Sequence, residues 1–269
     1  MILLITGSAG LVGQLLRPRL ASPGRTLRLL DVAEQAPPAS GEDVEIVTAS
    51  ITDPAAMAAA CRGVDAIVHL GGLSNEAPWA DILAVNIDGT HTLLEAARQA
   101  GVRRVVLASS NHAVGFYTRD DAPADGVPAD MAPRPDTYYG VSKAANEALG
   151  RLYHDRFGMD VICLRIGTWF EKPGSARGLA TWMSPDDGAR LVEASLATPN
   201  PGFRIVWGIS RNTRRWWSLA EGEAIGYHPV DDAEKFASEY LNGQEPDLTD
   251  PVHRLLGGQF CAIPLGELR

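Results

Sequence analysis

The sequence predicts an α/β fold built on a doubly wound parallel sheet, with a smaller C-terminal region added to it. Three observations support this fold class. Short, continuously apolar runs recur along the first 166 residues, helical segments separate them, and a glycine-rich turn follows the first run. Strands buried on both faces form unbroken apolar runs, and their alternation with helices is typical of a parallel sheet covered on both sides.

The expected strands follow one another at regular spacing until about residue 170. They cover residues 2–6, 26–31, 44–48, 66–70, 104–109 and 160–166. Beyond them, glycine and proline interrupt residues 171–182, and the remainder combines a strand at 204–208 with helical stretches such as 231–241. We therefore expect residues 1–165 to form the main part and residues 166–269 a smaller region interleaved with the same globular unit.

Three of the expected helices have recognisable ends. Asp53 is placed to cap a helix that has Pro54 at its first position and Gly63 after its end. Residues 82–101 repeat apolar side chains at helical spacing and stop at a glycine, and residues 136–158 predict a third helix. Each helix lies between two expected strands, as the crossovers of a parallel sheet require.

The chain is acidic, with a formal net charge of -9 and a pI near 5.1. Nucleic-acid and anionic membrane surfaces require clustered Lys and Arg, so we expect neither partner and interpret the short basic run at 211–215 as a solvated loop. Cys61, Cys163 and Cys261 lack metal-binding spacing, which predicts a reduced protein without a metal site. The first strand follows Met1 directly, without a signal peptide or membrane span, so we expect a cytoplasmic protein.

The first expected strand ends in TGSAGLVG, in which two residues separate each of Gly7, Gly10 and Gly13 from the next. Such glycines allow a tight turn and close approach to a pyrophosphate, and the following helix N-terminus offers free N–H groups and a positive dipole end. Asp31 ends the second strand, about 20 residues on, as a dinucleotide fingerprint of the Rossmann type requires. A carboxylate there accepts hydrogen bonds from ribose hydroxyls and repels a 2′-phosphate, so the expected cofactor is NAD rather than NADP.

A polar strand end and a tyrosine–lysine pair supply candidate catalytic groups. Ser109 and Ser110 end an apolar strand, where polar groups cost free energy unless neighbours or a ligand satisfy them. Tyr139 and Lys143 are four residues apart, on one face of the helix expected at 136–158. An ammonium group one turn away favours the phenolate, so this spacing predicts a tyrosine with a lowered pKa that acts as a general base.

These motifs together resemble the extended short-chain dehydrogenase/reductase superfamily. The resemblance depends on TGSAGLVG, Asp31 and the segments VHLGG, VNIDGT, ASS and YYGVSK, and it covers the first 165 residues. It implies that Tyr139 is the catalytic acid/base, that Lys143 also holds the nicotinamide ribose, and that Ser110 orients the reacting oxygen. Tyr138 competes by identity, but only Tyr139 has the four-residue spacing to the lysine.

Segments along nearly the whole chain are similar to those of uronate dehydrogenases, which use NAD to oxidise the anomeric carbon of glucuronate or galacturonate. These segments are HLGGLSNEAPW, SSNH, YGVSK, RIGTWF, ARGLATW, IVWGIS and RRWW. The resemblance implies a homo-oligomer that oxidises a hexuronate to an aldarolactone. It implies that the uronate is bound by Ser74, Ser110, Asn111, His112, Tyr139, Thr168 and Arg177. It implies that NAD is bound by Gly7, Gly10, Leu11, Val12, Gly13, Asp31, Val32, Ser50, Ile51, Leu70, Gly71, Gly72, Asn86, Tyr139, Lys143 and Trp169.

Two places depart from that family's pattern. Thr168 stands where the family has a serine, and the bulky Trp169 follows it. Ser50 and Ile51 replace an Asp-Leu pair that contacts adenine in the family. The resemblance therefore implies a looser contact with adenine, in which the apolar side chain of Ile51 is retained.

Alternatives to these assignments remain open from the sequence. Arg177 suits a bidentate contact with a carboxylate but could be an ordinary loop arginine, and Asn111 and His112 could be satisfied strand-end side chains. His69 is expected beside the cofactor without a chemical role. The expected packing residues of the C-terminal region are Trp207, Trp216 and Trp217. A sugar-nucleotide epimerase or reductase would use the same tyrosine and lysine, whereas a non-catalytic NAD-sensing regulator would need neither.

Overall fold

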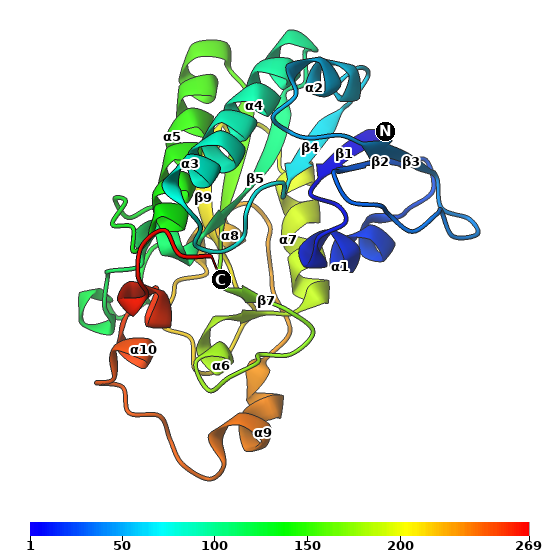
Figure 1. Cartoon of the computed structure of the whole chain (residues 1–269). Coiled ribbons are helices and arrows are strands. Elements are labelled where there is room, and N and C mark those ends of the chain that lie inside the picture. The colour runs from blue at the N-terminus through cyan, green and yellow to red at the C-terminus, as the bar shows by residue number, and fades with distance from the viewer. Residues whose placement is uncertain (269) are drawn as a thin grey trace.

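The structure, a computed structural model, describes residues 1–268 and is built around one seven-stranded sheet (Figure 1). All neighbouring strands in this sheet are parallel, in the order β3-β2-β1-β4-β5-β6-β9. They are β1 (Ile2–Thr6), β2 (Thr26–Asp31), β3 (Val44–Thr48), β4 (Ala66–His69), β5 (Arg104–Ser110), β6 (Asp160–Ile166) and β9 (Phe203–Gly208). Two short strands, β7 (Thr168–Trp169) and β8 (Trp182–Met183), pair separately. The predicted fold class is confirmed.

Helices connect the strands, and shorter helical turns lie in the loops. The α-helices are α1 (Leu11–Leu20), α2 (Pro54–Ala60), α3 (Trp79–Asp81), α4 (Gly89–Gln99), α5 (Tyr138–Phe157), α6 (Gly178–Thr181), α7 (Pro185–Ala197), α8 (Ala220–Glu223), α9 (Ala237–Leu241) and α10 (Pro251–Arg254). A π-helical segment, η1 (Ile82–Asp88), precedes α4, and the 3₁₀ turns are η2 (Asn111–Val114), η3 (Arg119–Asp121), η4 (Ala233–Phe236) and η5 (Gly258–Ala262). Of the helices in residues 1–268, none has the length and apolarity needed to cross a membrane.

The predicted start of α2 is confirmed by its hydrogen bonds, and the helices expected at 82–101 and 136–158 form over 82–99, with a π-helical first part, and over Tyr138–Phe157. The Asp53 side chain accepts hydrogen bonds from two backbone N–H groups at the start of α2, and Pro54 occupies the first helical position. The Thr137 hydroxyl caps α5, which ends at Gly158 with a left-handed φ of 67°. Each cap satisfies backbone groups that a helix end leaves unpaired.

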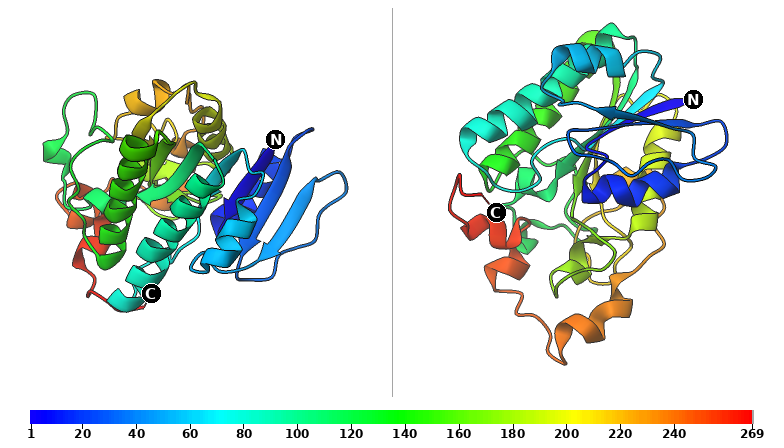
Figure 2. Two further views of the ribbon diagram at one scale, coloured as in Figure 1. Left: turned by 90° about the horizontal axis from the view of Figure 1, so that it is seen from above. Right: turned by 45° about the vertical axis from the view of Figure 1, so that its right-hand side comes forward.

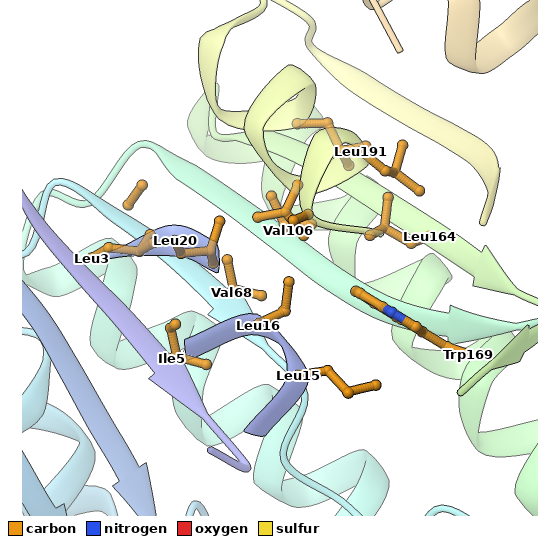
Figure 3. Close-up of a cluster of buried hydrophobic side chains, with 14 of the residues drawn as sticks. Leu3, Ile5, Leu15, Leu16, Leu20, Val68, Val106, Leu164, Trp169 and Leu191 are labelled. Carbon is orange, nitrogen blue, oxygen red and sulfur yellow. The ribbon is translucent and has the colours of Figure 1, made fainter. Parts of the chain in front are cut away.

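The sheet is covered on both faces, as the two views in Figure 2 show. On one face, Leu16 of α1 and Leu191 of α7 pack with strand residues such as Val106 (Figure 3). On the other face, α2, α4 and α5 supply a second core that includes Leu93 and Tyr153. Burying one such leucine stabilises the fold by about 1.5–3 kcal/mol, so both layers fix the strands that carry the candidate site.

The C-terminal region continues the sheet instead of standing apart from it. β9 extends the sheet beside β6, and α7 packs against α1. The rings of Trp207 and Trp217 lie 4.4 Å apart and are each 1% exposed, and Trp216 packs edge-on against Trp217. The predicted packing role of these tryptophans is confirmed. Residues 252–260, near the red end of the chain in Figure 1, then line the cleft at the carboxyl ends of the strands.

The order of the strands places a crevice between β1 and β4. The chain runs outward from β1 to β2 and β3, and then returns to form β4 on the other side of β1. Loops that follow these strands diverge at this reversal, and ligands of doubly wound sheets bind there, beyond the carboxyl ends of the strands.

Candidate active site

A cleft of about 1500 Å³ opens at the carboxyl ends of the sheet strands. Its walls are the loops after β1 to β6, together with parts of residues 166–177 and 252–260. Every residue predicted for the site lines this cleft except Gly13 and Asn86. The polar groups that follow β5 therefore face the cleft, where a ligand or water can satisfy them.

The loop after β1 has the shape of a phosphate cradle. Gly7 has a φ of 70°, and a Cβ on it would lie 2.6 Å from the backbone nitrogen of Gly71. Gly13 lies behind the cleft wall, where a Cβ would lie 2.5 Å from the Ser8 carbonyl oxygen, so it allows α1 to pack closely. No side chain caps α1 at Gly10. The first N–H groups of α1 therefore remain free for a ligand, and a pyrophosphate fits this cradle.

Asp31 lies beside this loop at the end of β2. Its two carboxylate oxygens accept hydrogen bonds from the backbone N–H groups of Ala9, at 2.9 Å, and Ala33, at 3.0 Å. Each oxygen retains a lone pair for a ribose hydroxyl. The adjoining cleft residues within the described chain, 30–33, include no Lys or Arg to pair with a 2′-phosphate. This environment fits NAD, as the sequence predicts.

Asn86 is placed behind the cleft wall by its hydrogen bonds. Its amide exchanges two hydrogen bonds with the backbone of Leu73, at 2.7 and 3.0 Å, and donates a third to the Ser142 hydroxyl at 3.0 Å. The amide therefore holds the loop that carries Gly71 and Gly72, and its predicted direct contact with NAD stays a prediction.

His69 is a buried histidine enclosed by two hydroxyl groups. Its Nδ1 lies 2.7 Å from the Thr6 hydroxyl and its Nε2 3.0 Å from the Thr90 hydroxyl. Burial, and to a lesser degree the charge of Lys143, lowers the pKa of His69 to about 3. The imidazole is therefore neutral at physiological pH, consistent with the expectation that it performs no chemistry.

His69 should make folding stability sensitive to acid. The unfolded histidine takes up a proton near pH 6.5, whereas the folded one does so only at about pH 3. The free energy of unfolding should therefore fall by up to about 1.4 kcal/mol for each pH unit below the unfolded pKa. Urea unfolding at neutral and at mildly acidic pH measures this decrease in the free energy of unfolding. The decrease should be smaller for His69→Gln than for the wild type, and the exposed His91→Gln should lose as much stability as the wild type. Equal losses in all three proteins would contradict this account.

The first turn of α5 brings the predicted catalytic groups together. The Tyr139 N–H donates to the buried Glu76 carboxylate at 2.8 Å, which fixes the start of the helix. Lys143 Nζ donates to the Ala108 carbonyl at 2.8 Å and lies 5.3 Å from the centre of the Tyr139 ring. Ser110 ends β5 and lines the same part of the cleft. The structure thus juxtaposes Tyr139, Lys143 and Ser110, as the sequence predicts.

The predicted lowering of the tyrosine pKa is wrong for the cleft as described. Burial raises the pKa of Tyr139 to about 12, the Ser110 hydroxyl acts in the opposite direction, and the charge of Asp136 adds to the rise. Burial also lowers the pKa of Lys143 to about 8, although the charge of Glu147 opposes this change. Sequence spacing reports the distance between charges but not their removal from water, which here outweighs charge proximity. The resting tyrosine is therefore a neutral phenol.

A buried ion pair supports the catalytic strand and helix from behind. Arg165 Nε and Nη2 donate hydrogen bonds to the two oxygens of the Glu147 carboxylate, at 2.8 and 2.7 Å. Both side chains are almost completely buried. The Ser109 hydroxyl donates to the same carboxylate at 2.6 Å. Ser109 is thus committed to this network, whereas Ser110 is available to a ligand.

The C-terminal segment organises the substrate end of the cleft. The Leu256 carbonyl accepts hydrogen bonds from Asn111 Nδ2, at 2.6 Å, and from Arg177 Nη2. The His112 ring stacks on Phe260 with 4.1 Å between ring centres. Burial lowers the pKa of Arg177 to about 10, so the guanidinium remains charged at neutral pH. No carboxylate within residues 1–268 forms an ion pair with Arg177, which leaves its charge available to an anionic ligand.

The residues that depart from the expected family pattern are accommodated by their neighbours. The Thr168 hydroxyl lies 2.9 Å from that of Thr181, so it retains a polar partner at the cleft wall. Trp169 is 2% exposed and packs over Gly188, where a Cβ would lie 2.1 Å from the indole ring. Ile51 lines the cleft and is buried, so the apolar surface expected beside adenine is present.

Sequence reasoning missed several residues that shape this site. Asp136 holds His112, Glu147 supports Lys143, and the C-terminal Leu256 and Phe260 hold the substrate end. No local motif marks these residues, because their contacts arise only when distant segments of the chain meet. The burial of charged residues is the only signal, and a single sequence does not report it.

Comparisons with known proteins agree with this geometry. Residues 3–184 match the model of the NAD dependent epimerase/dehydratase family. A uronate dehydrogenase from Pseudomonas putida is 41% identical over 259 residues, which cover 96% of this chain and 95% of that protein. A uronate dehydrogenase from Agrobacterium tumefaciens, solved as a tyrosine-to-alanine mutant complexed with NAD, is 39% identical with a TM-score of 0.90, covering 98% of this chain and 97% of that one. A glucuronic acid dehydrogenase from Chromohalobacter salexigens is 38% identical with a TM-score of 0.91 and the same coverage.

Proposed function

The chain belongs to the NAD dependent epimerase/dehydratase family and, within it, to the uronate dehydrogenases, and we propose that it oxidises C1 of a cyclic hexuronate to an aldarolactone. The observation that supports this most directly is the guanidinium of Arg177, which forms no ion pair within residues 1–268 and lines the same cleft as Tyr139, Lys143 and Ser110. A uronate carries a carboxylate at one end and an oxidisable anomeric hydroxyl at the other, and the two halves of the cleft match these groups.

In the proposed reaction, NAD bound in the cleft would supply the acceptor for the hydride that leaves C1. Tyr139, once its own phenol proton has passed to solvent, takes the proton of the anomeric hydroxyl as a phenolate and becomes a phenol again, and Ser110 shares a hydrogen bond with that oxygen. Lys143 supplies positive charge that stabilises this phenolate before the transfer, and it binds the nicotinamide ribose. Because C1 of the closed sugar already carries the ring oxygen, loss of hydride and proton leaves a lactone carbonyl.

Cofactor contacts come from one end of the cleft and substrate contacts from the other. We propose that the loop after β1 holds the pyrophosphate and that Asp31 holds the adenosine ribose. Asn111, His112, Thr168 and Ser74 bind sugar hydroxyls, with Arg177 on the carboxylate. This division agrees with the cleft lining, since each of these side chains reaches its wall.

The proposal is tested by the appearance of NADH absorbance with glucuronate, galacturonate, glucose and UDP-glucuronate in parallel. We expect NADH with both uronates, little with glucose, and much less activity when NADP replaces NAD. Turnover of glucose at the rate of the uronates would contradict the carboxylate assignment. Interconversion of UDP-sugars without net NADH would instead identify an epimerase.

Arg177→Ala should raise KM for uronates by about 10- to 100-fold, because it removes charge-assisted hydrogen bonds to the C6 carboxylate. The affinity for NAD should change little, since Arg177 belongs to the substrate end. Steady-state kinetics and calorimetric titration with NAD measure the two effects. Lys172→Ala is the matched control, because Lys172 also lines the cleft but pairs with Glu239 at 2.9 Å. An unchanged KM in the Arg177 variant would remove this residue from the site.

We further propose a cytoplasmic homo-oligomer. Cys61, Cys163 and Cys261 are free thiols, which is typical of a reducing compartment, and the family resemblance implies several subunits. Light scattering after size-exclusion chromatography would give the number of subunits, and a monomeric mass would contradict the second part of this proposal.

A further inference from the structure

A buried carboxylate lies directly behind His112. The Asp136 side chain, which precedes the cap of α5, has no exposed surface, and its Oδ2 lies 2.7 Å from His112 Nδ1. Its Oδ1 accepts a hydrogen bond from the Thr137 hydroxyl at 2.9 Å, and the Cys261 thiol lies 3.9 Å from Oδ2. No Lys or Arg in residues 1–268 forms an ion pair with it. Isolated carboxylates are costly to bury, so His112 is the group that compensates this one.

Three glycines from separate segments leave room for this carboxylate. A Cβ on Gly115 would lie 2.0 Å from Asp136 Oδ2, and one on Gly257 would lie 1.9 Å from the same oxygen. A Cβ on Gly140 would lie 2.9 Å from Oδ1. A side chain at either of the first two positions would clash with the carboxylate. The glycines therefore leave space for the carboxylate of Asp136 in the orientation that it has here.

The His112 ring is fixed on its other sides as well. It stacks on Phe260 at an interplanar angle of 29°, and its edge faces the Tyr139 ring with 5.8 Å between centres. A carboxylate only accepts hydrogen bonds, so Nδ1 carries the hydrogen, and in the Nδ1–H tautomer the lone pair lies at Nε2. His112 lines the cleft, and Nε2 has no hydrogen-bond partner among the described residues. Nε2 is therefore an acceptor available to a ligand.

We propose that Asp136 is a positioning residue that holds His112 in the Nδ1–H tautomer, so that Nε2 accepts a hydrogen bond from a hydroxyl of the substrate. The identity of that substrate as a uronate rests on the proposed function. Asp136 lies behind the histidine and does not line the cleft, so its hydrogen bond reaches the sugar through His112, while its charge also raises the pKa of Tyr139. Its loss should therefore affect sugar binding and leave NAD binding unchanged.

The tautomer of His112 can be determined without measuring catalytic activity. Long-range ¹H–¹⁵N correlation spectra of the ¹⁵N-labelled wild-type protein distinguish the two neutral tautomers, and the chain contains only six histidines. The signals that are present in the wild-type spectrum and absent from the spectrum of His112→Gln belong to His112. We expect the Nδ1–H form, and the Nε2–H form in the wild type would overturn the proposal. This measurement stands even if the sugar substrate proves to be different.

Kinetics of Asp136→Asn test the functional consequence. The new amide can donate to Nδ1, which moves the histidine hydrogen to Nε2 and removes the acceptor. We expect KM for the uronate to rise about 10-fold, the loss of one hydrogen bond, with little change in the affinity for NAD. The exposed Asp130→Asn, in the same loop, is the matched control and should match the wild type.

A double-mutant cycle separates positioning from general structural damage. If Asp136 acts through His112, Asp136→Asn should add no further loss to His112→Gln. Losses that add fully, or wild-type kinetics in Asp136→Asn alone, would overturn the proposal. If the Asp136 variant fails to fold, the spectrum of the wild-type protein still decides the tautomer.

Discussion

Replacing Tyr139 by phenylalanine should lower kcat by about 10²- to 10⁴-fold while leaving the affinity for NAD nearly unchanged. The substitution removes one hydroxyl group and keeps the ring, which is 8% exposed and packs beside Ala77 and Ile82. Without the hydroxyl, no side chain at this position accepts the proton of the anomeric oxygen. Stopped assays of NADH formation and calorimetric titration with NAD measure the two quantities separately.

Tyr138 provides a matched control for this experiment. It is the preceding residue of α5, and its ring packs edge-on against Trp79 with 5.4 Å between centres instead of lining the cleft. Tyr138→Phe should therefore retain nearly normal turnover. Substantial activity in the Tyr139 variant, or an equal loss in both variants, would remove Tyr139 from its role as the base.

The raised pKa of Tyr139 changes how the lysine is understood. The sequence predicts a tyrosine already activated in the resting enzyme, whereas burial holds the pKa of the phenol at about 12. The phenolate that takes the substrate proton therefore has to be generated from this phenol before the transfer, and the charge of Lys143 and the hydroxyl of Ser110 stabilise it. A resting tyrosine that titrates near neutral pH would contradict this view, and ultraviolet difference spectra of the phenolate would detect it.

Most of the sheet could be predicted because its signal is local. The expected strands at 2–6, 26–31, 44–48 and 160–166 have the observed limits, since unbroken apolar runs between polar turns leave little freedom in placing them. Helix α7 was not predicted, although Ser184 caps it and Pro185 occupies its first position. It follows residues 171–182, where glycine and proline interrupt the regular alternation of strands and helices that predicts the other elements.

The residues of the candidate site likewise fall into those that local spacing predicts and those that it does not. The glycine loop, Asp31 and the tyrosine–lysine pair are close in sequence to the turns that place them, so spacing alone indicates their roles. Leu256 and Phe260 reach the site through contacts with residues more than 100 positions away, at the end of β5. The role of Asp136 depends on its burial beside His112. Periodicity and motif spacing contain no information about such contacts.

The buried pair of Glu147 and Arg165 gives the second large expected effect, this time on stability. Glu147→Gln should lower the free energy of unfolding by about 3–5 kcal/mol, because it leaves the fully buried guanidinium of Arg165 without its charged partner. Urea unfolding measures this loss. Asp155→Asn, which removes an exposed ion pair of the same helix, should cost less than about 1 kcal/mol.

The coupling between the two buried charges distinguishes a charge effect from a packing effect. Arg165→Met leaves the buried Glu147 carboxylate without its charged partner and also leaves the carbonyls of Ala129 and Met131 without a donor. It should therefore destabilise the fold at least as much as Glu147→Gln. The double variant Glu147→Gln/Arg165→Met contains neither buried charge. Its loss in the free energy of unfolding should therefore be smaller than the sum of the losses of the two single variants. Strict additivity would show that the pair contributes through packing alone.

Glu147 also connects this stability to catalysis, because its charge raises the pKa of Lys143 against the effect of burial. Glu147→Gln should therefore lower that pKa below about 8 and leave a smaller fraction of charged lysine at mildly alkaline pH. The alkaline limb of the kcat/KM profile should move to lower pH in the folded variant, whereas it should not move in Asp155→Asn. A destabilised variant with an unchanged profile would mean that the buried pair supports the fold without tuning the lysine.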